Sequence, residues 1–261
     1  MSDLVTVQAM NHSALCTLNL PSKRNPISAE MRASLIAELD ALSRNETIRS
    51  VIITGAGSAF CSGLDLDGLA EQAHKTPAEH RDDSQSIANF FEYIAHYPKP
   101  TIAAVNGPAV AGGCGLALLC DFTIMRAEAY FSFSEVKIGF VPALVGVYLE
   151  RMVGPKVSRD LLLTGRKISA NEAKALGLIT EVVDSGKLHE RANEISALLA
   201  QNSPVAIRQT KELLTRSQAL TLPQSIALAV DVNATARTTS ECVEGVNSFL
   251  EKRSPKWAQG V

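Results

Sequence analysis

Hydrophobic and polar positions follow two rhythms along the first two thirds of this chain. Longer segments repeat apolar residues every three or four positions, as amphipathic helices do, and they alternate with short apolar runs typical of β-strands. The short runs are residues 14–20, 50–54, 99–105, 122–125 and 179–183. This alternation predicts an α/β fold whose strands are buried on both faces.

The helices of the first two thirds are clearest at their starts. Ser28 is a typical N-cap residue, and apolar residues then recur on one face up to about residue 43. A further helix is predicted over residues 113–119. Residues 66–83 are different, because they are polar and charged with little apolar pattern. We expect them to form a mobile surface loop.

From about residue 189 onward the strand pattern stops. Four helices are predicted there, over residues 188–201, 205–216, 222–239 and 242–252. Helices with apolar stripes and no sheet beside them need another surface to cover those stripes. We therefore expect a core of residues 1–195 and a helical region of residues 196–261 that packs against other subunits. A helical subdomain of the single chain is the alternative.

The composition excludes several classes of protein. The 261 residues are 46% hydrophobic and 20% charged, with a net charge of −2, so nothing indicates a nucleic-acid partner. No apolar run approaches the roughly 18 residues needed to span a membrane. The N-terminus lacks the pattern of a secretory signal. The five cysteines are scattered without a CxxC pair. Free thiols in a cytoplasmic protein fit this pattern, and a metal site does not.

Two glycine-containing loops carry the candidate chemistry. Residues 60–65 and 111–115 each follow a predicted buried strand, so both can lie at one edge of the sheet. Small residues let the backbone approach a ligand closely, and the first turn of a helix offers free N–H groups. One amide from each loop could bind the same oxygen, which is the form of an oxyanion hole. A tight turn whose small residues serve packing is the alternative.

Other chemistries for the same loops are weaker. Residues 55–60 nearly spell the GxGxxG dinucleotide fingerprint, but Phe60 stands at the last position and no helix follows. We therefore expect no nicotinamide cofactor. Cys61 and Cys114 lie in the glycine loops, yet neither has a histidine beside it in the sequence. Small buried cysteines are more common than catalytic ones.

Several short motifs together resemble the crotonase (enoyl-CoA hydratase/isomerase) superfamily. They are residues 59–66, 99–107, 111–114, 120–121, 162–165, 170–173, 177–179 and 249–253, in the expected order over nearly the whole chain. The resemblance implies a crotonase-like spiral of ββα units followed by C-terminal helices that form homotrimers, often paired into hexamers. It implies no metal or redox cofactor, because coenzyme A is part of the substrate.

The resemblance also implies a set of binding residues. The substrate would be an acyl-CoA thioester whose carbonyl oxygen lies between two backbone amides, which fall by position on Ser62 and Gly112. Coenzyme A would bind along a further set, of which the last two residues reach in from the same chain or its neighbour. That set is Lys23, Arg24, Asp65, Leu66, Phe249 and Lys252.

An enolate route also needs an acid–base group beside the thioester carbonyl. Typical hydratases of the family carry two glutamates, but this chain has Gly115 at the first position and Glu135 at the second. Glu135 follows a Phe-Ser-Phe run, so we expect it to be partly buried with a raised pKa. A surface carboxylate paired with Lys137 is the alternative. Tyr148 or Glu150 could replace the missing acid only if their helix faces the pocket.

Loss of the first glutamate leaves the reaction open. One carboxylate can move a proton between two carbons, as in the Δ3,Δ2-enoyl-CoA isomerases of this family. However, residues 135–145 resemble single-glutamate hydratases of branched or dicarboxylic enoyl-CoA esters. We therefore expect hydration of a 2-enoyl-CoA with Glu135 as the single catalytic glutamate, and isomerisation as the alternative. A decarboxylase, a thioesterase or a non-catalytic acyl-CoA-binding protein of the same fold remains a further alternative.

Overall fold

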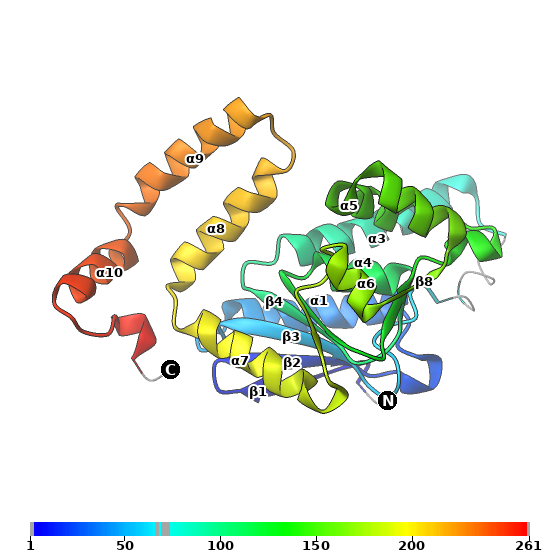
Figure 1. Cartoon of the computed structure of the whole chain (residues 1–261), viewed down its shortest axis with the longest axis horizontal. Helices are drawn as coiled ribbons and strands as arrows, with labels where there is room; N and C mark the ends of the chain where they lie inside the picture. Colours follow the sequence, from blue (N-terminus) through cyan, green and yellow to red (C-terminus); the bar gives the residue numbers. More distant parts are fainter. Residues whose placement is uncertain (1–2, 66–67, 69–73, 260–261) are drawn as a thin grey trace.

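The structure is a computed structural model that describes residues 3–65, 68 and 74–259 (Figure 1). Its main sheet has the strand order β1-β2-β3-β4-β6-β9. These strands are β1 (Val5–Met10), β2 (Ser13–Leu18), β3 (Ser50–Gly55), β4 (Thr101–Val105), β6 (Phe122–Arg126) and β9 (Glu181–Val183). Only the β1–β2 pair is antiparallel among these six strands, so the other five, β2, β3, β4, β6 and β9, run in one direction.

A small second sheet has the order β5-β7-β8. Its strands are β5 (Ala109–Val110), β7 (Tyr130–Ser132) and β8 (Lys167–Ser169). The β5–β7 pair is parallel and the β7–β8 pair is antiparallel. An isolated bridge joins Cys61 to Ala109 of β5, so the chain that follows β3 lies beside this sheet.

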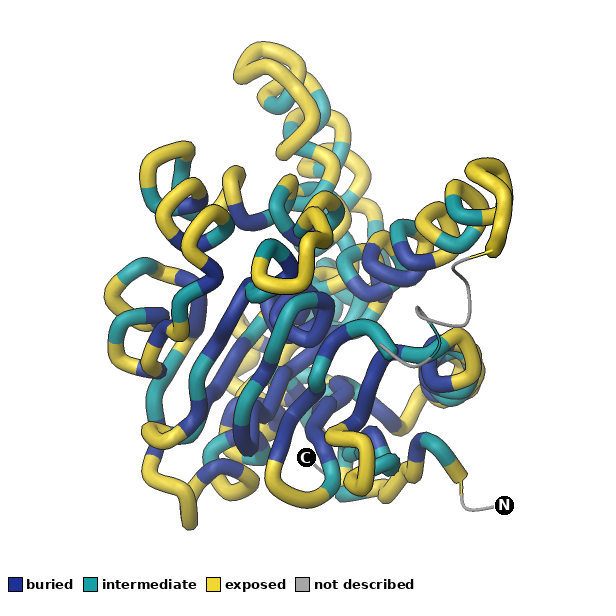
Figure 2. Tube along the Cα trace, turned by 90° about the vertical axis from the view of Figure 1, so that its right-hand side faces the viewer, coloured by how far each residue is buried: buried dark blue, intermediate teal, exposed yellow. Residues whose placement is uncertain are grey.

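Helices cover both faces of the main sheet. They are α1 (Ala29–Arg44), α3 (Pro77–Ala95), α4 (Gly112–Leu119), α5 (Ala143–Thr164), α6 (Ala170–Ala175) and α7 (Leu188–Ala200). Alternate strand residues point to opposite faces. Val51 and Ile53 of β3 therefore join the large core with α1, α3, α4 and α5, whereas Ile52 packs with α7. Figure 2 shows the buried strands between these layers.

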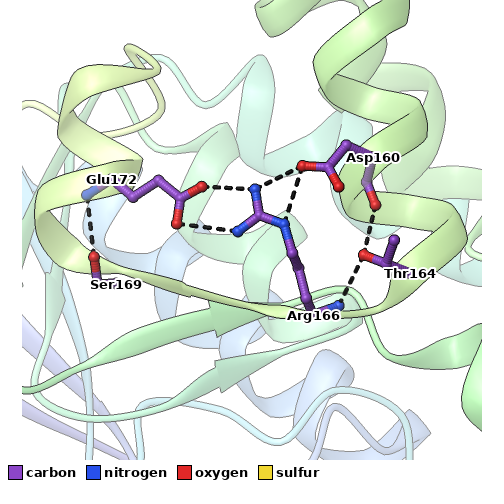
Figure 3. A network of polar contacts seen from close by, with 5 residues as sticks. All are labelled: Asp160, Thr164, Arg166, Ser169 and Glu172. Carbon is purple, nitrogen blue, oxygen red and sulfur yellow. Dashed lines mark hydrogen bonds and ion pairs between the residues drawn. The ribbon is translucent and has the colours of Figure 1, made fainter.

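The turn from α5 into α6 is held by a polar network (Figure 3). Arg166 donates to Asp160 Oδ2 of α5 and, through two nitrogens, to both carboxylate oxygens of Glu172 in α6. Ser169 caps α6 by accepting from the Glu172 amide at 3.2 Å. The Arg166 guanidinium thus links the end of α5 to the start of α6.

The last three helices extend away from the body (Figure 1). They are α8 (Pro204–Ser217), α9 (Leu222–Ala236) and α10 (Ser240–Leu250). No residue of α8 or α9 is buried, and Ile226, Val230 and Phe249 are among the exposed apolar side chains. The predicted boundary after residue 195 lies within α7, and the helices that leave the body begin at Pro204.

One ion pair fastens this tail to the body. Lys211 Nζ of α8 lies 2.5 Å from Asp121 Oδ2 and also donates to the Lys99 carbonyl at 3.1 Å. Asp121 Oδ2 accepts from the Thr101 amide as well, at 2.8 Å, which places the carboxylate at the start of β4. The orientation of α8 is therefore coupled to the main sheet.

The sequence predicted the five parallel strands and the helices from α7 to α10, with ends that differ by at most three residues. The expected loop over residues 66–83 was wrong from residue 77, where α3 begins with a capping box between Thr76 and Glu79. Residues 66–67 and 69–73 lie outside the described residues. Across the described segments, no helix is both long and apolar enough to cross a membrane.

Candidate active site

Three chain segments meet at the edge where β5 and β7 end. These strands are parallel with Val110 opposite Ser132, so the chain beyond β5 reaches Gly112 at the same edge at which the chain beyond β7 reaches Glu135. The Ala111 amide donates to the Ser132 carbonyl at 2.8 Å. The third segment is residues 61–64, because the Val110 amide donates to the Cys61 carbonyl at 2.9 Å. The predicted convergence of the two glycine loops is confirmed.

The approach of the two loops requires glycine on both sides. Gly63 has a φ of +86°, and a Cβ there would lie 2.6 Å from the Val110 carbonyl oxygen and 3.1 Å from the Gly112 nitrogen. A Cβ on Gly113 would overlap the Cys61 carbonyl oxygen. Only glycine accepts both the positive φ and this backbone contact. The small residues thus serve close packing of two loops, and that packing brings Gly63 against Gly112.

The amides of the two loops differ in whether they already have acceptors. The Ser62 amide donates to the Arg24 carbonyl at 2.9 Å, which disfavours Ser62 as a donor to a substrate oxygen. Among the described residues, the Leu64 amide donates to no acceptor. Gly112 is the first residue of α4, so its amide has no acceptor within the helix. Leu64 and Gly112 are therefore the available pair.

Ala111 turns the chain so that α4 can begin. Its φ of 52° and ψ of −122° are unusual for a residue with a side chain. Such backbone strain collects at functional sites and persists only where the surroundings enforce it. Here the bonds from Ala111 to Ser132 and from Val110 to Cys61 enforce it.

Glu135 is a buried carboxylate at this edge. It follows β7 at the start of a 3-10 helix (Glu135–Ile138) and is 7% exposed. No described residue donates a hydrogen bond to its buried Oε2. Burial raises the pKa of Glu135, although a hydrogen bond with its own backbone opposes the change. The predicted burial is confirmed, and the alternative of a surface carboxylate paired with Lys137 does not fit.

The position of the missing glutamate is filled by apolar side chains. A Cβ on Gly115 would lie 2.9 Å from both Phe91 Cζ and Val145 Cγ2. The Phe91 ring in turn meets Tyr148 edge to face, with centroids 6.5 Å apart. Glu150 is exposed to solvent. The helix that carries both candidates therefore turns Tyr148, and not Glu150, toward this part of the core.

Two of the residues expected to bind coenzyme A lie against the residue 61–64 loop. The Lys23 carbonyl accepts from Ser62 Oγ at 3.3 Å, and Arg24 is held in the left-handed region with φ 61°. Asp65 follows the loop directly and is half-buried, and Leu66 lies outside the described residues. Phe249 and Lys252 lie at the end of α10, which is remote from α4 in Figure 1. One chain alone does not bring them to the site.

The thiols are poorly suited to nucleophilic chemistry. Cys61 and Cys114 are fully buried, and desolvation raises the pKa of the Cys61 thiol to about 12 and that of Cys114 well above its ordinary range. A thiol must ionise to attack, so neither fits a catalytic nucleophile. Within the part of the chain that the structure describes, no group of three or more His, Cys, Asp or Glu side chains could hold a metal ion.

Sequence reasoning missed two residues of this site. Leu64 could not be preferred over Ser62 because the bond from Ser62 to Arg24 joins segments far apart in the sequence. Phe91 was missed because no helix was predicted around it. The signal for that helix was the Thr76-Pro77-Ala78-Glu79 sequence, which matches a capping box.

The chain is similar to known proteins over nearly its full length. The family described as enoyl-CoA hydratase/isomerase matches residues 9–260. A Thermus thermophilus protein whose name places it among enoyl-CoA hydratases is 46% identical over 246 residues, covering 94% of this chain and 97% of that protein. The 1,2-epoxyphenylacetyl-CoA isomerase of Escherichia coli is 34% identical over 247 residues, covering 92% of this chain and 93% of that protein. The crystal structure of an enoyl-CoA hydratase from Polaromonas sp. JS666 has a TM-score of 0.91 at 33% identity. The match covers 97% of this chain and 98% of that one.

Proposed function

This chain belongs to the enoyl-CoA hydratase/isomerase family, and we propose that within it the protein adds water to the double bond of a 2-enoyl-CoA thioester. The observation that carries the proposal is the buried Glu135 carboxylate, whose Oε2 has no donor among the described residues, at the edge that also presents two free amides. Fold alone does not fix a reaction, so the proposal depends on these groups.

The thioester oxygen binds between the amides of Leu64 and Gly112. Negative charge develops on that oxygen as the enolate forms, and two fixed N–H donors stabilise it. A single donor of this kind contributes roughly 3 kcal/mol to the transition state. The positive end of α4 adds to the effect, because Gly112 opens the helix. Ser62 instead holds the loop to Arg24.

Glu135 acts as both base and acid. Its carboxylate takes a proton from water while the water oxygen bonds to C3, and the electron pair of the C2=C3 bond moves into the enolate. The protonated Glu135 then gives its proton to C2. One water has been added and Glu135 is again a carboxylate. A carboxyl group whose pKa is raised by burial is closer to the operating pH, which suits it to both steps.

Isomerisation is the second candidate, and the environment of Gly115 favours it. Phe91 and Val145 fill the space that a second carboxylate would need, so only one acid is available to orient water. The same Glu135 could take a proton from C2 of a 3-enoyl-CoA and return it to C4, through a dienolate whose oxygen binds the same two amides. A relative at 34% identity is an isomerase of a different CoA thioester.

One spectroscopic assay separates the two reactions. The absorbance of the conjugated thioester falls when crotonyl-CoA is hydrated, and it rises when a 3-enoyl-CoA is isomerised. We expect the fall. A rise with the second substrate and no change with the first would replace hydration by isomerisation. Glu135→Gln should lower either rate by about 10²- to 10⁴-fold, because general acid–base catalysis is of that size.

The exposed apolar tail supports an assembly of several copies. Helices α8 and α9 bury no residue within the chain, and apolar side chains on them are more than half exposed. A homotrimer, alone or paired into a hexamer, would cover these faces and bring Phe249 and Lys252 to the site of a neighbour. We place the protein in the cytoplasm, where five unpaired cysteines stay reduced.

A further inference from the structure

A buried asparagine closes the turn that leads to the expected coenzyme A contacts. Asn25 is 0% exposed and has a positive φ of 57°. Its side-chain Oδ1 accepts from the Leu20 amide at 2.9 Å, and its own amide donates to the Leu20 carbonyl at 3.0 Å. Residues 20–25, which include Lys23 and Arg24, are thus held in one conformation by this residue.

The other end of the same side chain reaches the loop before the oxyanion site. Asn25 Nδ2 donates to the carbonyl oxygens of Ala56 and Ala59, both at 2.9 Å, and lies 3.4 Å from that of Phe60. Asn106 holds the beginning of this loop, by accepting from the Gly55 amide at 3.1 Å. Asn25 holds its end, directly before residues 61–64.

Backbone hydrogen bonds continue this contact on both sides of Asn25. The Arg24 carbonyl accepts from the Ser62 amide at 2.9 Å, and the Ile27 amide donates to the Gly63 carbonyl at 2.7 Å. Residues 20–27 therefore line one side of the loop, while residues 108–112 line the other. The Leu64 amide follows the last of these anchored residues.

We infer that Asn25 is a positioning residue for the thioester oxygen site. Its side-chain amide sets the place of the Leu64 N–H relative to that of Gly112, without touching the substrate. A misplacement of about 1 Å at a catalytic group can lower a rate by about 10²-fold. We therefore expect a substitution of Asn25 to lower kcat as well as the stability of the protein. It also couples the segment that carries Lys23 and Arg24 to the residue 61–64 loop.

Asn25→Asp tests this role, because it nearly preserves shape, keeps the acceptor for the Leu20 amide and removes both donors. The first readout is kcat with the active enoyl-CoA. The second is the absorption of bound 4-dimethylaminocinnamoyl-CoA, a thioester whose band moves to longer wavelength when its carbonyl is polarised. We expect kcat to fall about 10- to 100-fold, and the band shift to shrink with it.

The matched control is Tyr97→Phe, which also deprives a buried carbonyl of a side-chain donor. Tyr97 is 1% exposed, and its hydroxyl donates to the carbonyl of Leu39 in α1 at 2.9 Å. We expect it to lower the melting temperature without changing kcat or the band shift. Should Asn25→Asp fail to fold, Asn25→Ser, which keeps one donor, is measured for the same two changes.

The inference rests on the proposed function, and the chromophore separates their failures. If the wild-type protein binds the probe without a band shift, the oxyanion site is wrong and the role of Asn25 falls with it. If the wild type shows the shift and Asn25→Asp keeps both shift and kcat, the role of Asn25 alone is overturned. Equal losses of kcat in Asn25→Asp and Tyr97→Phe would also overturn it, because stability would then explain both.

Discussion

The ring of Phe91 leaves no room for a side chain on Gly115, since a Cβ there would lie 2.9 Å from the ring's Cζ. Val145 closes the same space from α5 at an equal distance. Gly115→Ala should therefore lower the free energy of unfolding by about 1–3 kcal/mol, the usual cost of overpacking a core. Chemical denaturation measures this change.

The matched control for that prediction is Gly186→Ala. Gly186 has no atom within 4 Å of the position a Cβ would take and does not need a positive φ. Its substitution should change the free energy of unfolding by less than about 0.5 kcal/mol. Equal effects at the two positions would show that Phe91 and Val145 move aside readily.

Buried Glu135 should lower stability when it is ionised. Its pKa is raised in the folded protein above the ordinary 4.5, so the folded state binds the proton more tightly than the unfolded chain does. The stabilising contribution of the neutral acid is complete below pH 4.5 and is lost as the pH rises through the raised pKa. Glu135→Gln should therefore be more stable than wild type at pH 7 and lose that advantage below pH 4.5. Urea titrations at several pH values measure this difference, and a constant difference would contradict it.

The Leu64 amide should matter for turnover and the Ser62 amide should not act on substrate directly. Replacing the Leu64 amide by an ester removes one N–H and keeps the side chain. We expect kcat to fall about 10²- to 10³-fold, as for loss of one oxyanion donor. The same replacement at residue 62 removes the bond to Arg24 and should lower stability more than kcat. If the ester at residue 62 lowered kcat more than the ester at residue 64, the Ser62 amide would be the donor to the substrate oxygen.

The ion pair between Lys211 and Asp121 should stabilise the junction between tail and body. The two side chains are only 10% and 27% exposed, so water screens them weakly. Lys211→Met should lower the free energy of unfolding by about 1.5–3 kcal/mol, the range for hydrogen bonds to charged groups. Arg216→Met breaks the exposed pair with Glu212 and should cost less than about 1 kcal/mol. Thermal denaturation compares the two variants.

The apolar face of α9 should hold the assembly together. Ile226 and Val230 are 56% and 62% exposed in the single chain. The double variant Ile226→Asp, Val230→Asp should sediment as a smaller species than the wild type, because charges at an apolar interface are costly to bury. Thr210→Asp, an exposed polar position on α8, should leave the sedimentation coefficient unchanged. An unchanged coefficient in the double variant would contradict the proposed interface.

The sequence predicted the elements with strong periodicity and missed those defined by tertiary contacts. β3 contains a continuous apolar run, Val51–Ile53, so this strand was placed within one residue. By contrast, β5 has two residues and β7 has three, and their pairing depends on partners far along the chain. A helix was expected around Tyr148 and Glu150 but without bounds. Gly154, with φ 74°, and the following Pro155 interrupt the helical pattern of α5.

The same division applies to the site. Glu135 and Gly112 were predicted from their positions in the motifs that resemble the family, and the Phe-Ser-Phe run before Glu135 added only the expectation that it is buried. Asn25 and Phe91 could not be identified, because their importance lies in contacts with residues 56–60 and with Gly115. Ser62 was likewise predicted by its motif position, and the bond of its amide to the Arg24 carbonyl, which turns our proposal to Leu64, depends on a segment far away in the sequence.

The distribution of thiols makes the native chain suitable for selective labelling. Cys16, Cys61, Cys114 and Cys120 are buried, whereas Cys242 on α10 is partly accessible. A maleimide dye added under native conditions attaches to the tail first, without any engineered cysteine. Mixing donor- and acceptor-labelled preparations then reports subunit exchange by energy transfer.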